Sequence, residues 1–169
     1  MKNVILIGMP GAGKSTVGVV LAKVLGYDFI DSDLLIQKED GRLLWQIIRD
    51  EGIEGFKQIE ERVNSHIQTE NSVISTGGSV VYGPAAMEHL RSIGTVVFLD
   101  VSYSSLKKRL GNLTKLKPGQ SLHDLYQERI ALYRQYAHVT VHPVDFDIQE
   151  TVAAVCRALN KILFLSQQE

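Results

Sequence analysis

The chain has 169 residues, of which 44% are hydrophobic, and a formal net charge of −1. This length fits one domain over residues 1–169 with a single sizeable core. The near-neutral charge lacks the basic excess typical of proteins that bind nucleic acid or an anionic membrane, so we expect small-molecule partners. The single cysteine excludes an internal disulfide, and the sequence shows no signal peptide or membrane-length apolar run. We therefore expect a cytoplasmic protein, and a monomer.

A phosphate-binding loop lies between a predicted strand and a predicted helix. Gly8, four further residues and Gly13-Lys14-Ser15 match the spacing G-x-x-x-x-G-K-[ST], after the apolar run 4–7. The glycines let backbone N–H groups converge on phosphate oxygens, Lys14 adds a mobile positive charge, and the Ser15 hydroxyl suits a Mg²⁺ shell. A plain glycine-rich turn is the less favoured alternative. We expect ATP and Mg²⁺ to bind here, with nucleotide contacts from Gly11, Ala12, Gly13, Lys14, Ser15 and Thr16.

A second predicted strand at 27–30 ends in two acidic residues, Asp31 and Asp33. At the carboxyl end of a strand, both carboxylates can face the crevice where α/β sheets bind ligands. They can equally be the N-cap and the first-turn acid of a helix over 34–39. The phosphate loop that precedes them favours the crevice.

The segment 41–68 has a helical pattern with a break at 51–52. We expect Trp45 in the core, with a place in a pocket wall as the alternative. Lys57 and Glu60 are three residues apart and therefore share a helix face, where a surface ion pair is the simplest interpretation.

The next predicted strand, 73–75, is followed by the adjacent glycines Gly77 and Gly78. Such glycines suggest that a ligand approaches the backbone closely, although a tight turn is also consistent with them. Further along, 111–120 has the composition of a mobile cover over phosphates or of an ordinary exposed loop. Arg129 lies among apolar and aromatic residues on a predicted helix, so it is a candidate anion clamp rather than a default surface arginine.

Strands at 94–100 and 139–141 and helices at 84–91, 104–110, from 121 and at 148–165 complete the pattern. Strands that alternate with helices in this way predict an α/β fold with about five parallel strands and helices on both faces. The five histidines show no metal-ligand spacing. The phosphate loop then marks the active edge of the sheet.

The segments GMPGAGKST, DSD, FKQIEE, TGGS and ERIALYRQYA, in this order over nearly the whole chain, resemble the shikimate kinase family. The resemblance implies a three-layer α/β/α P-loop kinase fold with a parallel sheet of order 2-3-1-4-5. It implies a substrate-binding helical region at about 32–62 and a short lid at about 111–120. It also implies transfer of the γ-phosphoryl group of ATP to the 3-hydroxyl of shikimate, a step of aromatic amino-acid biosynthesis.

The resemblance assigns roles at the reaction centre. Asp33 corresponds to the aspartate that contacts the substrate hydroxyls and orients or deprotonates the attacking one, and Asp31 to the aspartate near Mg²⁺. Arg109 resembles a residue that packs on adenine. The lid arginine of the family has no clear counterpart, and Lys115 or Lys117 could reach the transferred phosphoryl group in its place. We expect Lys14, Asp33 and Lys115 to be the catalytic residues.

The resemblance also outlines an acceptor pocket. Gly78 corresponds to a glycine whose backbone meets the substrate, Glu60 to a supporting acid, and Arg129 to the arginine that binds the shikimate carboxylate. Two positions depart from the family: Lys57 replaces an arginine and Ser79 replaces a third glycine. A lysine keeps the charge but loses the fork that holds a carboxylate through two parallel bonds.

These departures keep two alternatives open. One is a P-loop kinase that acts on another small hydroxylated acid or hydroxyamino acid. The other is a nucleotide-binding module without catalysis, which the acceptor-pocket residues argue against.

Overall fold

A computed structural model describes residues 3–110, 119–144 and 147–165 of the chain. Its sheet has five parallel strands in the order β2-β3-β1-β4-β5. The strands are β1 (Asn3–Ile7), β2 (Asp28–Asp31), β3 (Ser72–Ser75), β4 (Gly94–Leu99) and β5 (Val139–Val141). The predicted order and each predicted strand are confirmed within about a residue at either end.

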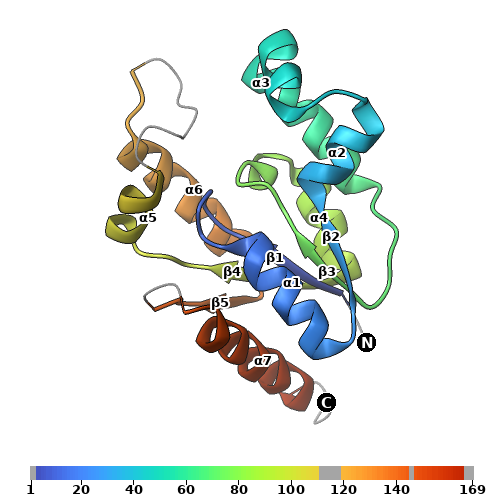
Figure 1. Cartoon of the computed structure of the whole chain (residues 1–169), viewed down its shortest axis with the longest axis vertical. Helices are drawn as coiled ribbons and strands as arrows, with labels where there is room; N and C mark the ends of the chain where they lie inside the picture. The colour runs from blue at the N-terminus through green and yellow to red at the C-terminus, as the bar shows by residue number, and fades with distance from the viewer. Residues whose placement is uncertain (1–2, 111–118, 145–146, 166–169) are drawn as a thin grey trace.

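Helices cover both faces of the sheet (Figure 1). On one face, α1 (Lys14–Leu25) packs on β2, β3 and α7 (Ile148–Leu165). The opposite face carries α4 (Pro84–Ile93) and α6 (Leu122–Tyr136), which follows α5 (Tyr103–Leu110) in the chain. The result is the three-layer arrangement that the sequence predicts.

The core forms where the middle strands meet these helices. All five residues of β1 are buried, because β1 lies between β3 and β4 and has helices above and below. Such a strand reads as a continuous apolar run rather than an alternating one. A rigid strand therefore carries the phosphate loop that follows Ile7 directly.

A second, smaller apolar cluster lies away from the sheet. Helices α2 (Ser32–Asp40) and α3 (Leu44–Ser65) bury Ile36, Ile47, Phe56 and Val63 between them. The backbone of Gly52 leaves helical geometry at φ 74° and ψ −179°, so α3 bends at the predicted break. Its first half turns away from the sheet and stands with α2 at one end of the molecule (Figure 1).

Trp45 does not lie where the sequence predicts. Trp45 is 52% exposed, with Arg49 over its ring, so the expectation of a core position is wrong. Ile47 faces the cluster while Trp45, two positions earlier, points about 160° away from it around the helix.

Most of the predicted lid, including Lys115 and Lys117, lies outside the described residues. Within the described part of the chain, no helix has the length and apolar content needed to span a membrane.

Candidate active site

The phosphate loop joins β1 to α1 at the carboxyl edge of the sheet. Gly11 and Gly13 have φ values of 77° and 87°, a region that L side chains rarely adopt, so these turns require glycine. Helix α1 begins at Lys14 directly after Gly13, which has no side chain to cap it. The first-turn N–H groups and the positive end of the helix dipole therefore remain available to an anion.

The side chain of Lys14 lies inside this loop. Its Nζ donates hydrogen bonds to the carbonyl oxygens of Gly8 at 2.8 Å and Met9 at 2.9 Å. Burial lowers the pKa of Lys14 to about 8, and the negative charge of Asp33 opposes that shift. The loop thus holds the ammonium group through two backbone carbonyl oxygens, at the place where a bound phosphate would meet it.

Ser15 and Asp31 form a cluster of oxygen atoms beside the loop. The Ser15 hydroxyl donates to Asp31 Oδ2 at 2.8 Å and lies 3.1 Å from the Ser75 hydroxyl. The other oxygen of Asp31 caps α2 by accepting from the backbone N–H of Asp33 at 3.0 Å. Hard oxygen donors next to a phosphate site are what Mg²⁺ prefers, so this pair fits that ion.

Asp33 is placed in the first turn of α2 by that cap. Burial raises the pKa of its carboxyl, and the nearby charge of Asp31 raises it further. The two interpretations of the acidic pair therefore both hold: Asp31 is the N-cap, and Asp33 reaches a cavity beside the loop.

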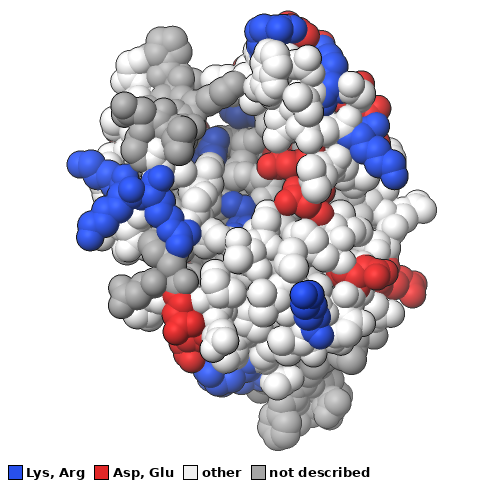
Figure 2. All heavy atoms as spheres, viewed as in Figure 1, with Lys and Arg blue, Asp and Glu red and all other residues white. Residues whose placement is uncertain are grey.

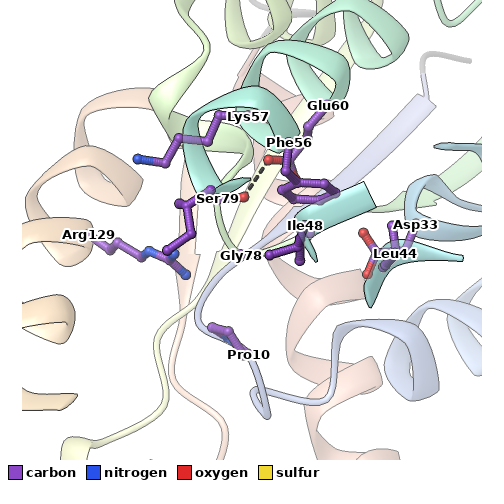
Figure 3. Close-up of a pocket in the computed structure, with 12 residues that line it drawn as sticks. Pro10, Asp33, Leu44, Ile48, Phe56, Lys57, Glu60, Gly78, Ser79 and Arg129 are labelled. Carbon is purple, nitrogen blue, oxygen red and sulfur yellow. Dashed lines mark hydrogen bonds between the residues drawn. The ribbon is translucent and has the colours of Figure 1, made fainter. Parts of the chain in front are cut away.

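The cavity has a volume of about 230 Å³ and lies between the phosphate loop and the α2–α3 region. Its apolar wall consists of Pro10, Leu44, Ile48, Ile53 and Phe56. Its polar wall consists of Asp33, Lys57, Glu60, Ser79 and Arg129, with the backbone of Gly77 and Gly78. In Figure 3, Asp33 stands on one side of the view, and Lys57 and Arg129 stand on the other.

Glu60 is the most deeply buried acid of this wall, with 1% of its surface exposed. Its Oε2 accepts a hydrogen bond from the Ser79 hydroxyl (Figure 3). Its Oε1 has no hydrogen-bond partner among the described residues. Burial raises the pKa of Glu60 to about 7, although the bond from Ser79 works in the other direction. Near neutral pH this carboxyl can therefore both hold and release a proton.

Two cations occupy the end of the cavity opposite Asp33. The shared helix face suggested an ion pair between Lys57 and Glu60, and that expectation is wrong. The Nζ of Lys57 lies 3.2 Å from Glu54 Oε1 and 3.9 Å from the ring centre of Tyr82. Arg129 points in from α6, and its buried Nε has no hydrogen-bond partner within the described ranges. A buried guanidinium with an unused donor is suited to a carboxylate.

The adjacent glycines leave room for a ligand beside the charged groups. A Cβ on Gly77 would lie 2.6 Å from Glu60 Oε1 and 2.9 Å from Asp33 Oδ1. One on Gly78 would lie 2.7 Å from Pro10 Cδ and 2.9 Å from a terminal nitrogen of Arg129. The two glycines thus connect the carboxylates, the phosphate loop and the cation end of a single cavity.

The structure brings together all six residues expected to bind the acceptor, namely Asp33, Lys57, Glu60, Gly77, Gly78 and Arg129. Their contact with a substrate stays a prediction. Arg109, expected beside adenine, donates to the carbonyl oxygen of Gly11 at 2.7 Å and so lies against the phosphate loop. The sequence interpretation missed Tyr82. Its contacts, Lys57 and Arg129, are far away in the sequence, so no local pattern predicts them.

Figure 2 shows this face of the molecule, with a hollow between the α5 side and the α2–α3 side. Basic side chains lie in the hollow and acidic ones lie on its rim. Charged groups of both signs therefore surround one opening.

A phosphate loop at the carboxyl edge of this parallel sheet, opening on a cavity that holds a carboxylate of raised pKa, defines a P-loop kinase that phosphorylates a hydroxyl group. A family model described as shikimate kinase matches residues 10–160. The chain belongs to the shikimate kinase family.

Relatives and solved structures agree with that membership. The chain is 38% identical over 164 residues to a shikimate kinase of Thiobacillus denitrificans, covering 93% of this chain and 87% of the relative. A shikimate kinase of Acinetobacter baumannii, solved in complex with shikimate, has a TM-score of 0.87 at 30% identity, covering 95% of this chain and 94% of that one. A shikimate kinase of Aquifex aeolicus has a TM-score of 0.81, also at 30% identity, covering 96% of this chain and 98% of that one.

Proposed function

We propose that this chain transfers the γ-phosphoryl group of ATP to the 3-hydroxyl of shikimate. The observation that carries the proposal is the polarity of the cavity: Asp33 lies at one end, and Lys57 and Arg129 lie at the other. Shikimate has hydroxyls on one side of its ring and a carboxylate on the other. The shikimate complex of the Acinetobacter baumannii relative supports the same assignment.

Phosphoryl transfer depends on alignment and on charge neutralisation more than on covalent chemistry. In the proposed arrangement Arg129 and Lys57 hold the carboxylate, so that a hydroxyl at the far end of the ring meets Asp33. The raised pKa of Asp33 makes its carboxylate a stronger base toward that hydroxyl proton. Lys14 leaves the loop carbonyls and neutralises the transferred phosphate.

ATP binds, in this proposal, through the N–H groups of the loop, with the Lys14 side chain at the β- and γ-phosphates. Ser15 and Asp31 are the residues that would hold Mg²⁺, as their exposed oxygens 2.8 Å apart fit a hard cation. When bound, Mg²⁺ offsets the negative charge of the phosphates. Among the described residues no group of three or more His, Cys, Asp or Glu side chains forms a metal site, so phosphate oxygens and water would complete the shell.

The test is a coupled assay of ADP release with ATP, Mg²⁺ and shikimate. Wild-type protein should turn over, and Asp33→Asn should lower kcat by about 10²- to 10⁴-fold, the usual contribution of a general base. Asp28→Asn, at the exposed start of β2, is the matched control and should retain full activity. Absence of turnover with shikimate would refute the proposal, and an Asp33→Asn protein of unchanged rate would refute the role of Asp33.

A second acceptor is favoured by one specific observation. Lys57 has a single ammonium group in place of the family's forked guanidinium, and this group contacts Glu54 and Tyr82. Ser79 adds a hydroxyl to the cavity wall. Both features could suit another small hydroxylated acid or a hydroxyamino acid. A competition assay in which such compounds displace shikimate would detect this alternative.

We also propose that the protein is a monomer, because Pro10 of the phosphate loop, Asp33 and Arg129 already meet around one cavity within a single chain. Sedimentation should give the mass of one chain, 18.8 kDa, and a multiple of it would contradict the monomer.

A further inference from the structure

Tyr82 is the last residue of the short 3₁₀ helix η1 (Val80–Tyr82), which follows the glycine pair. Val80 and Val81 are buried, so this turn is fixed on the core just before the tyrosine. The Tyr82 hydroxyl donates to Glu128 Oε1 at 2.5 Å, which fixes the other end of the ring on α6. The ring is therefore held at both ends, by the buried turn of η1 and by the bond to Glu128 on α6.

Both cations of the cavity lie over this one ring. Lys57 Nζ, from α3, is 3.9 Å from the ring centre, and Arg129 Cζ, from α6, is 5.4 Å from it. Each distance is within the roughly 6 Å at which an aromatic ring attracts a cation. Tyr82 is thus a common contact for two charges that come from different helices.

The ring also limits where the Lys57 ammonium can go. A lysine has a long, flexible stem, and its only ion pair among the described residues is with Glu54, whose side chain is 71% exposed. An exposed pair of this kind holds a lysine weakly. Contact with Tyr82 instead keeps the ammonium beside Arg129, so that both positive charges face the same end of the cavity.

We propose that Tyr82 is a positioning residue that sets carboxylate affinity by holding Lys57 and Arg129 together over its ring. This inference rests on the proposed function, because it concerns the acid group of that substrate. A rigid guanidinium fork restricts the position of its charge before the ligand binds. The ring of Tyr82 restricts the position of the Lys57 ammonium in the same way, although less strictly. It therefore helps to explain how a lysine can serve where the family has an arginine.

The experiment compares two substitutions of Tyr82. Tyr82→Phe keeps the ring and removes the hydroxyl, which bonds to Glu128 and interacts with Arg129, whereas Tyr82→Leu removes the ring as well. We expect Tyr82→Leu to raise the KM for shikimate about five- to thirtyfold, the combined effect of two such contacts, with kcat and the KM for ATP within about threefold. Tyr82→Phe should raise the KM for shikimate by a clearly smaller factor than Tyr82→Leu does, because the ring remains although its hydroxyl contacts are lost. Tyr27→Leu, a half-buried tyrosine at the opposite edge of the sheet, is the control for a general loss of packing.

A neutral probe separates charge recognition from shape. The methyl ester of shikimate lacks the carboxylate, so its KM should be the same in wild type and Tyr82→Leu. A double-mutant cycle with Lys57→Met adds a second readout: once Lys57 is gone, removing the ring should raise the KM by a smaller factor than it does in wild type.

Several results would overturn the role of Tyr82. They are a shikimate KM unchanged in Tyr82→Leu, an equal rise for shikimate and its ester, equal effects of Tyr82→Phe and Tyr82→Leu, and full additivity with Lys57→Met. Any of these with an active wild type leaves the proposed function standing. A wild-type protein inactive on shikimate would overturn both.

Discussion

The hydroxyl of Ser79 donates a hydrogen bond to Oε2 of the buried Glu60, joining the turn after β3 to the C-terminal half of α3. The family pattern has a glycine at position 79, which could not make this bond. Lys57, the expected partner of Glu60, contacts Glu54 instead. Ser79 therefore supplies Glu60 with a hydrogen-bond donor that Lys57 does not.

Removing the hydroxyl should destabilise the protein in a pH-dependent way. Ser79→Ala leaves an ionised Glu60 buried with neither oxygen bonded, which costs about 1–3 kcal/mol in the free energy of unfolding. The loss should be seen at pH 8 and should shrink at pH 5.5, where Glu60 is protonated, because its pKa is about 7. Urea unfolding at the two pH values measures it.

Ser92→Ala is the matched control, since the Ser92 hydroxyl bonds to a backbone carbonyl on the exposed side of α4. Its effect should be small and the same at both pH values. Equal stability of Ser79→Ala and wild type at pH 8 would contradict the assignment.

The raised pKa of Glu60 predicts a fall in stability with pH. Burial moves this pKa from 4.5 to about 7 on folding, so between these values the folded protein holds a proton that the unfolded chain has lost. The free energy of unfolding should therefore decrease as the pH rises through this window, by up to roughly 3 kcal/mol. Glu60→Gln should flatten the profile in urea titrations between pH 5 and 7.5.

Glu70→Gln, at an exposed position, should keep the wild-type slope. A slope that survives in Glu60→Gln would show that another group causes it.

The sequence predicts the fold well because the fold follows local patterns. Continuous apolar runs define the buried strands, and the loop spacing places the active edge of the sheet. The acidic pair shows the limit of such patterns, since two carboxylates at one strand end can cap a helix or face a cavity. The position of α2 decides that Asp31 caps the helix and that Asp33 faces the cavity.

Ion pairs and ring contacts are harder to predict for a geometric reason. Glu54 and Glu60 are each three residues from Lys57, so helical spacing cannot choose between them. The choice is made by Tyr82 and Ser79, which come from a different part of the chain. The expectation for Trp45 is wrong for a different reason: its large ring favours burial by residue type, but its place on α3, about 160° around the helix from the buried Ile47, puts it on the exposed face.

Replacement of Arg129 by lysine should weaken acceptor binding selectively. The substitution keeps the charge and removes the planar fork, including the buried Nε donor. A charge-assisted bond contributes about 1.5–3 kcal/mol, so the KM for shikimate should rise about 10- to 100-fold while the KM for ATP changes little. Arg134→Lys, on the same helix but 62% exposed at its side chain, should leave both constants unchanged. An unchanged shikimate KM in Arg129→Lys would exclude a carboxylate at this arginine.

Gly77→Ala should separate activity from stability. Its Cβ would meet Glu60 Oε1 at 2.6 Å and Asp33 Oδ1 at 2.9 Å, the free ends of two flexible side chains. Glu60 Oε1 has no hydrogen bond with the described residues to lose, and Asp33 faces the cavity, so small shifts of the two carboxylates cost less in folding than a backbone clash would. A displacement of about 1 Å at a reacting group can nevertheless lower the rate about 100-fold. We therefore expect kcat/KM to fall at least tenfold with little change in Tm.

Gly18→Ala gives the reciprocal control. Its Cβ would lie 2.7 Å from Phe29 Cε2, between α1 and β2 and away from the cavity. This variant should lose stability in thermal unfolding while its folded molecules keep the wild-type kcat/KM. If Gly77→Ala instead lowers Tm as much as Gly18→Ala does and keeps its activity, the open space beside the two carboxylates is not where the acceptor hydroxyl lies.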